Sequence, residues 1–179
     1  MTERTTARTR HGAAALTGLV LGLLALGPGL ARGYLLSYDM VAVPRQPLTA
    51  MTFGLTGTLP RHVPSDAFVA ALSAVVPGDL VQKALLLLVF VLGCAGAAAL
   101  VPSRRLVPRL AAGACYVWNP YVAERLVLGH WALLLGYAAL PWAVAAASAD
   151  GTRRLVRALV PAAVGGFAAM AVAGLPALA

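Results

Sequence analysis

Apolar runs long enough to cross a lipid bilayer, divided by short clusters of arginine, constrain this chain more than any other feature. The run at residues 12–31 carries no charge, and as a helix it reaches about 30 Å, the thickness of the hydrocarbon core. Apolar residues make up 60% of the chain and charged residues only 11%, which excludes a soluble domain, a disordered segment and a small disulfide scaffold. Four further apolar runs lie at 80–101, 106–118, 131–149 and 158–179. We therefore predict an all-α, polytopic transmembrane bundle of about five spans.

The distribution of basic residues predicts how these spans are oriented, because short cytoplasmic connections are enriched in Arg and Lys. The N-terminal tail 1–11 and the connections 102–109 and 150–157 together hold nine arginines: Arg4, Arg8, Arg10, Arg104, Arg105, Arg109, Arg153, Arg154 and Arg157. The loops 32–79 and 118–130 should then lie on the outer face of the plasma membrane, with the N-terminus in the cytoplasm. The basic residues behind the net charge of +8 stand in clusters between apolar runs. We therefore expect membrane lipid as a partner and no nucleic acid.

The first outer loop, 32–79, is long for a connection between spans, and long loops are often functional. Ser65 and Asp66 are typical of a helix start, and apolar residues then repeat at helical spacing until Pro77. The sequence therefore predicts a short helix over 67–76 that lies flat in the outer interface. An ordinary buried helix of a loop domain is the alternative.

Asp39 is the candidate catalytic residue, because it follows the first span closely in an otherwise apolar stretch. A partly desolvated carboxylate in such a place can act as a base or a ligand. The alternative is a turn residue that pairs with Arg32 or Arg45. Arg45 is itself a candidate for binding an anionic head group, and a solvated loop charge is the simpler interpretation.

A second informative segment is 116–142, where Asn119 followed by Pro120 predicts the start of a new helix. Ionisable residues near the membrane face are costly unless they are paired or functional. Glu124 and His130 converge only if Gly129 bends the chain. The candidate substrate-binding residues are therefore Arg45, Asn119, Glu124, Arg125 and His130.

Cys94 and Cys115 both lie in predicted spans, so we expect two free thiols that act as small apolar side chains. The sequence contains no Cys/His spacing typical of a metal site and no phosphate-binding loop. We therefore assign no cofactor and no metal ligand.

The predicted architecture resembles the N-terminal part of GT-C glycosyltransferases. It consists of a cytoplasmic N-terminus, one span, a long outer loop in which Asp39 comes early, and further spans joined by short loops. In that superfamily the first outer loop carries an acidic residue that acts as a base or a metal ligand, a role that maps onto Asp39. The run from Asn119-Pro120 through Gly129-His130-Trp131 also resembles actinobacterial multispanning membrane proteins, and the Pro-to-Gly-Gln stretch of arabinofuranosyl and mannosyl transferases. This chain has a lone Asp rather than an acidic pair, and His130 stands where Gln is usual, so the resemblance does not assign a divalent metal.

The resemblance implies transfer of a sugar from a polyprenyl-phosphate donor to a cell-envelope glycan on the outer face. Asp39 would deprotonate the acceptor, while Arg125 or Arg45 would stabilise the departing lipid phosphate. The resemblance covers most of this chain but under half of a typical enzyme, and the apolar end of the chain predicts an N-terminal fragment. The alternatives are a non-catalytic flippase or assembly subunit, and a truncated inactive fragment. An enzyme should reject amides at Asp39 and Glu124, whereas a scaffold should accept them.

Overall fold

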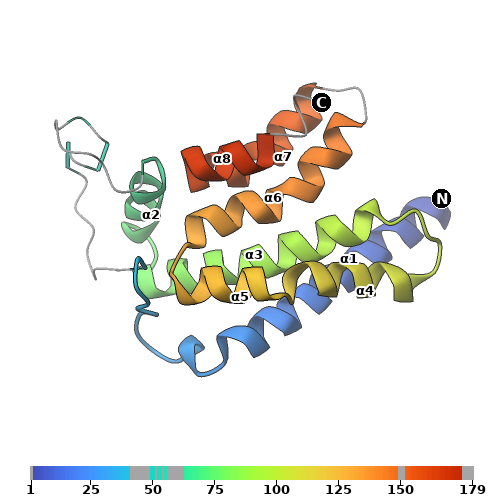
Figure 1. Ribbon diagram of the computed structural model, residues 1–179, viewed down its shortest axis with the longest axis horizontal. Helices are drawn as coiled ribbons and strands as arrows, with labels where there is room; N and C mark the ends of the chain where they lie inside the picture. Colours follow the sequence, from blue (N-terminus) through green and yellow to red (C-terminus); the bar gives the residue numbers. More distant parts are fainter. Residues whose placement is uncertain are drawn as a thin grey trace.

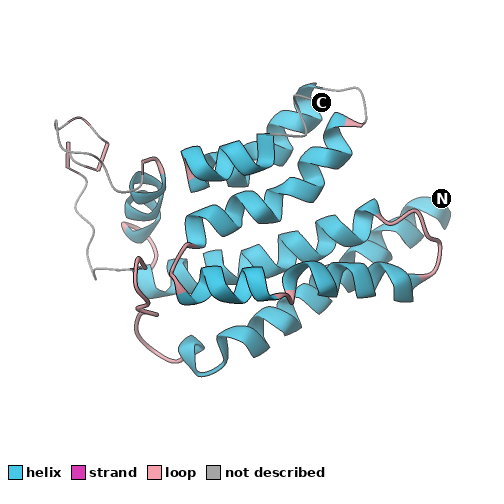
Figure 2. Ribbon diagram, viewed as in Figure 1, coloured by secondary structure: helices cyan, strands magenta, loops and turns pink. Residues whose placement is uncertain are grey.

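The computed structural model describes residues 2–40, 49–50, 52–53, 55, 63–148 and 152–174. Over these residues the protein is built from helices and turns (Figure 2), which confirms the predicted all-α class. The elements in chain order are α1 (Thr2–Leu26), the 3₁₀ helix η1 (Gly27–Leu30), α2 (Ser65–Ser73), α3 (Gly78–Leu100), α4 (Leu106–Val117), α5 (Pro120–Val127), α6 (Trp131–Ala147), α7 (Thr152–Gly165) and α8 (Phe167–Gly174). Helix α3 is central and packs against α1, α4 and α6, while α7 and α8 pack against α6 (Figure 1).

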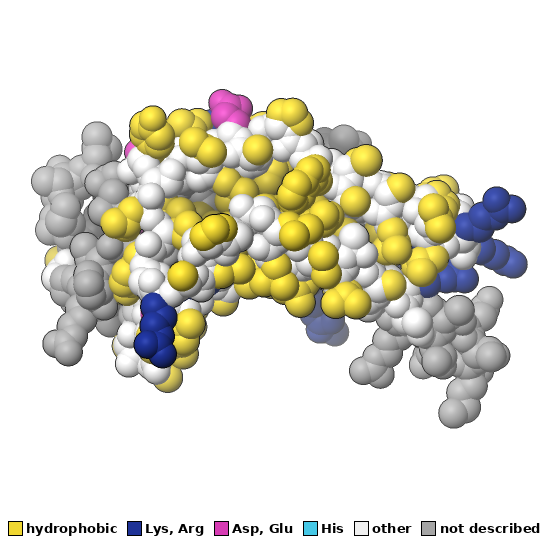
Figure 3. All heavy atoms as spheres, turned by 90° about the horizontal axis from the view of Figure 1, so that it is seen from below, with side chains coloured by type: hydrophobic (Ala, Val, Ile, Leu, Met, Phe, Trp, Pro, Cys, Tyr) yellow, Lys and Arg dark blue, Asp and Glu magenta, His cyan; other side chains and the backbone are white. Residues whose placement is uncertain are grey.

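Two helical segments, Thr9–Leu30 and Gly78–Leu100, are long and apolar enough to cross a membrane, and α6 is a shorter apolar helix. The helix α1 begins at Thr2 and so includes residues that the sequence predicted as a tail. Figure 3 shows a face covered along its length by apolar side chains, with most of the visible Lys and Arg at one end. These features support a membrane location.

The core lies between α3 and α6, where the largest fully buried side chains include Phe90, Leu86, Leu134 and Leu135. Both thiols are free, as predicted, with Cys94 buried and Cys115 exposed. Glycines bring the helices close together: a Cβ added at Gly136 of α6 would lie 2.5 Å from the Ala169 Cα of α8. Such spacing allows backbone contact between helices within this chain.

The C-terminal apolar run differs from the single span predicted over 158–179. Helix α7 already begins at Thr152, inside the predicted connection, and α8 begins after a break at Gly166, whose φ is +83°. Glycine adopts this left-handed conformation without steric cost, so the chain turns there. Hydropathy does not detect such a break, because the residues on both sides of Gly166 are apolar. Residues 175–179 lie outside the described residues.

The helix of the outer loop also differs in its start. Ser65 is the first residue of α2 rather than its cap, and Pro64 stands in the capping position without a side-chain bond. The buried Ser65 hydroxyl donates instead to the Val164 carbonyl of α7, at 2.8 Å. A buried hydroxyl needs such a partner, so this bond anchors α2 against α7.

Candidate functional site

A tight turn at residues 37–40 docks against the end of α5. Within the turn the Met40 amide donates to the Ser37 carbonyl at 2.7 Å, and the Asp39 amide donates across to the Leu128 carbonyl at 3.2 Å. The Ser37 hydroxyl donates to the Val127 carbonyl, which is 90 residues away in sequence. These bonds use carbonyl groups that the end of α5 leaves without helical partners. The segment that follows the first apolar helix is thereby fixed to the end of α5.

The local sequence explains why α5 starts and stops where it does. The Asn119 Oδ1 accepts from the Val122 amide at 3.0 Å, which confirms the predicted cap, and Pro120 occupies the first turn. The chain reverses at Gly129, whose φ is +79°. A Cβ there would lie 2.4 Å from the Ser37 carbonyl oxygen, so only glycine fits both the conformation and the space.

The reversal at Gly129 brings three predicted site residues together. The His130 Nε2 lies 3.2 Å from the Asp39 Oδ2, and the Arg125 Nη1 lies 3.1 Å from the His130 Nδ1. Because a guanidinium can only donate, His130 Nδ1 accepts and the ring carries its proton on Nε2. His130 therefore donates to the Asp39 carboxylate. We call Asp39, Arg125 and His130 the charged cluster.

Aromatic side chains hold the guanidinium of this cluster in place. The Arg125 guanidinium lies 5.3 Å from the centroid of the Tyr121 ring, on the shared helix face that i,i+4 spacing produces. Tyr121 in turn contacts Tyr137, which stacks on Tyr116 at a centroid distance of 4.3 Å. The Arg125 Nε is buried and has no hydrogen-bond partner among the described residues. The cation is thus kept beside His130 by ring contacts.

The charged cluster is open to solvent on the side of the carboxylate. The Asp39 side chain keeps 56% of its exposed area and His130 keeps 31%, so Asp39 is more exposed than the sequence suggested. A solute can therefore reach the carboxylate without rearrangement of the helices. Among the described residues no group of three His, Cys, Asp or Glu side chains forms a candidate metal site.

The other predicted site residues do not join the charged cluster. Glu124 lies exposed on α5, and its carboxylate makes no ion pair within the described part of the chain. The Asn119 amide nitrogen donates to the Tyr116 carbonyl at 2.7 Å and contacts the Tyr137 hydroxyl at 3.2 Å. Arg45 lies outside the described residues. Roles in substrate binding for these three remain predictions.

Sequence reasoning missed two contributors to the site. Ser37 fixes the turn on α5, and Tyr137 contacts Tyr121, the ring that lies beside the Arg125 guanidinium. The i,i+4 spacing of Tyr121 and Arg125 is the sequence feature that could have predicted the contact between this ring and the guanidinium. No local pattern indicates a contact between α5 and a residue near position 37.

The opposite face of α5 lines an apolar groove of about 500 Å³. Its walls come from α1, α3, the end of α4 and α5, and include Ala25, Phe90, Val117, Val122 and Val127. The Val127 carbonyl also accepts from the Ser37 hydroxyl, so one lining residue of the groove is bonded to the turn that carries Asp39.

The charged cluster joins a general-base candidate, an imidazole donor and a cation held by ring contacts, while the apolar groove lies on the other face of α5. This combination suits proton removal from a hydroxyl beside a developing anion. Comparison of the chain with protein families, with curated proteins and with solved structures finds no match.

Proposed function

We propose that this protein is an integral membrane enzyme that transfers a sugar from a polyprenyl-phosphate donor to a cell-envelope glycan, on the outer face of the plasma membrane. The contact between Asp39, His130 and Arg125 carries the proposal. It joins the residue that resembles the acidic base of GT-C enzymes to a cation suited to a lipid phosphate. Residues 91 positions apart meet at this point.

In the proposed reaction the Asp39 carboxylate takes the proton of an acceptor hydroxyl. The hydroxyl oxygen then forms a bond to the anomeric carbon, and the bond from that carbon to the phosphate oxygen breaks. Arg125 stabilises the negative charge left on the polyprenyl phosphate. A direct displacement of this kind inverts the configuration at the anomeric carbon. His130 acts as a positioning residue, since its Nε2 proton holds one carboxylate oxygen and leaves the other toward solvent.

The apolar groove supports a lipid-linked donor rather than a soluble sugar nucleotide. Its described lining residues carry hydrocarbon or aromatic side chains, apart from the capping Asn119. A surface of this kind can accept an isoprenoid chain from the bilayer through close packing contacts, whereas a soluble sugar nucleotide would leave it exposed. The chain would lie between α1 and α5, and its phosphate would extend past Val127 and the turn at 37–40 to reach Arg125.

We also propose that the N-terminus is cytoplasmic and that the remaining helices complete a bundle of about five spans around α1 and α3. The support is the position of the arginines. The connection from α3 to α4 and the start of α7 both lie at the end of the molecule where α1 begins, while the turn at 37–40 lies at the opposite end (Figure 1). Positive charge at the end opposite the charged cluster fits the positive-inside rule.

The test is sugar transfer by membranes that contain the Asp39→Asn variant, with synthetic polyprenyl-phosphate mannose and polyprenyl-phosphate arabinofuranose as donors. The amide keeps the shape of the side chain but cannot accept the proton, so transfer should fall by 10²-fold or more, on the order expected for general-base loss. The matched control is Asp66→Asn in the first turn of α2, which removes one carboxylate outside the charged cluster. Full activity of Asp39→Asn would overturn the proposal.

A second candidate is a non-catalytic membrane subunit, and the docking of the turn on α5 favours it. In that case the contact between the Asp39 carboxylate and His130 serves only to hold the turn on α5, together with the bonds of the Asp39 amide and the Ser37 hydroxyl. Asp39→Asn would then lower thermal stability without any transfer activity to lose. Measuring melting temperature and transfer on the same preparations separates the two candidates.

A further inference from the structure

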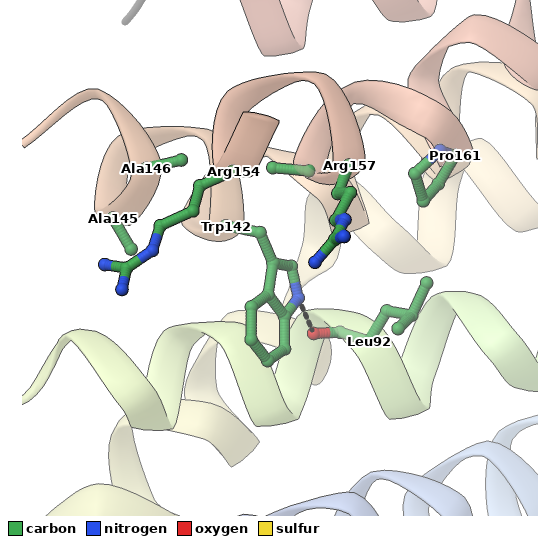
Figure 4. Close-up of a pocket in the computed structure, with 8 residues that line it drawn as sticks. Leu92, Trp142, Ala145, Ala146, Arg154, Arg157 and Pro161 are labelled. Atoms are coloured by element: carbon green, nitrogen blue, oxygen red, sulfur yellow. Dashed lines mark hydrogen bonds between the residues drawn. The ribbon is translucent and has the colours of Figure 1, made fainter. Parts of the chain in front are cut away.

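A second groove lies at the end of the molecule away from the charged cluster, between α3, α6 and α7. It has a volume of about 480 Å³. Figure 4 shows the Trp142 indole at its centre, with the side chains of Arg154 and Arg157 on either side. The lining residues are Leu92, Trp142, Ala145, Ala146, Arg154, Arg157, Ala158 and Pro161. Apart from the two guanidinium groups, the walls are apolar.

Trp142 forms a fixed wall of this groove. Its Nε1 donates to the Leu92 carbonyl at 2.9 Å, and a Cβ at Gly96 would lie 2.6 Å from the same nitrogen. The His11 ring of α1 lies 6.4 Å from the indole. The indole nitrogen is therefore satisfied within the protein, and the rest of the ring presents apolar surface to the groove.

The two arginines carry positive charge that the described protein does not neutralise. Arg154 and Arg157 are exposed and are three residues apart on α7, so they share one helix face. No carboxylate of the described residues lies within 4.0 Å of either guanidinium. They also occupy the first turns of α7, where the helix dipole disfavours cations and favours anions.

We propose that this groove binds an anionic phospholipid, with an acyl chain along Trp142 and the phosphate between Arg154 and Arg157. Guanidinium groups bind phosphate oxygens through paired hydrogen bonds, and a pair of them accounts for a preference for anionic head groups. The apolar walls account for a lipid rather than free phosphate, since inorganic phosphate gains nothing from hydrocarbon contact. This inference does not depend on the proposed transfer activity.

The experiment uses the full chain with Trp118→Phe and Trp131→Phe, so that Trp142 is the remaining tryptophan. The purified protein in mixed micelles is titrated with phosphatidylglycerol or phosphatidylcholine that carries brominated acyl chains, and quenching of Trp142 is measured. One arginine near an anionic lipid strengthens binding about fivefold, so two should favour phosphatidylglycerol on the order of 25-fold. Equal quenching by the two lipids would overturn the proposal.

The matched pair of variants separates a site from general surface charge. Arg154→Gln with Arg157→Gln should abolish the preference for phosphatidylglycerol, because these groups line the groove. Arg104→Gln with Arg105→Gln removes the same charge from exposed residues outside the groove and should preserve the preference. An equal loss in both variants would contradict the site. Displacement of brominated phosphatidylglycerol by millimolar inorganic phosphate alone would instead identify a free-phosphate site and overturn the lipid proposal.

Discussion

Substitution of Gly129 by alanine should detach the turn at 37–40 from α5. The residue has a φ of +79°, and the added Cβ would lie 2.4 Å from both the Met40 amide nitrogen and the Ser37 carbonyl oxygen. The left-handed conformation costs an alanine roughly 1–2 kcal/mol. Backbone atoms block the Cβ, so the turn must move and lose its two hydrogen bonds to the end of α5, worth about 1 kcal/mol each. We therefore expect a loss of roughly 3–4 kcal/mol in the free energy of unfolding.

Gly33→Ala is the matched control for this prediction. Gly33 also has a positive φ, of +103°, but nothing lies within 4 Å of an added Cβ. Only the conformational cost applies, so we expect a loss of roughly 1–2 kcal/mol. Both variants can be compared by denaturant titration in mixed micelles, with helical circular dichroism as the signal. Equal destabilisation by the two substitutions would refute the claim that Gly129 fixes the turn by close contact.

Three further substitutions test individual contacts. Asn119→Ala removes the cap of α5 and should lower the free energy of unfolding by about 1–2 kcal/mol in the same titration; no change would argue against the cap. Lys83→Met removes the ammonium that donates to the Ala31 carbonyl at 2.6 Å and pairs with Asp79. It should lower the free energy of unfolding by about 1–3 kcal/mol. A gain in stability would contradict this account. Arg125→Lys keeps the charge but loses the planar group that lies over Tyr121 and reaches His130. It should therefore lower sugar transfer on the order of tenfold, and unchanged transfer would argue against Arg125 in the site.

Signals that act within one or two helical turns were readable from the sequence. Asn119 and Pro120 predicted the start of α5 because capping involves residues three apart. The apolar run at 80–101 predicted α3 to within two residues at its start and one residue at its end. An uninterrupted apolar run of that length matches the thickness of a bilayer and so predicts one continuous helix. The sequence required a bend at Gly129 for the His130 side chain to turn back toward α5, and the structure contains this bend.

Contacts between distant segments were not readable in the same way. The sequence paired His130 conditionally with Glu124, but His130 contacts Arg125 on α5 and Asp39 from 91 residues earlier. Which partner is reached depends on how the turn at 37–40 docks, and that is a tertiary packing result. Ser65 was likewise interpreted as a cap, whereas its hydroxyl bonds to Val164, 99 residues away. Tertiary hydrogen bonds outweigh the local preference at this position.

The most direct test of the central claim is an assay of the purified wild-type protein in liposomes, with polyprenyl-phosphate mannose and polyprenyl-phosphate arabinofuranose as donors and a cell-envelope glycan as acceptor. Release of polyprenyl phosphate should match formation of a new glycosidic bond, and nuclear magnetic resonance should show inverted anomeric configuration. The charged cluster predicts this outcome because Asp39 activates the acceptor while Arg125 stabilises the departing phosphate. A product with retained configuration, or no transfer in liposomes that contain correctly folded protein, would contradict the account.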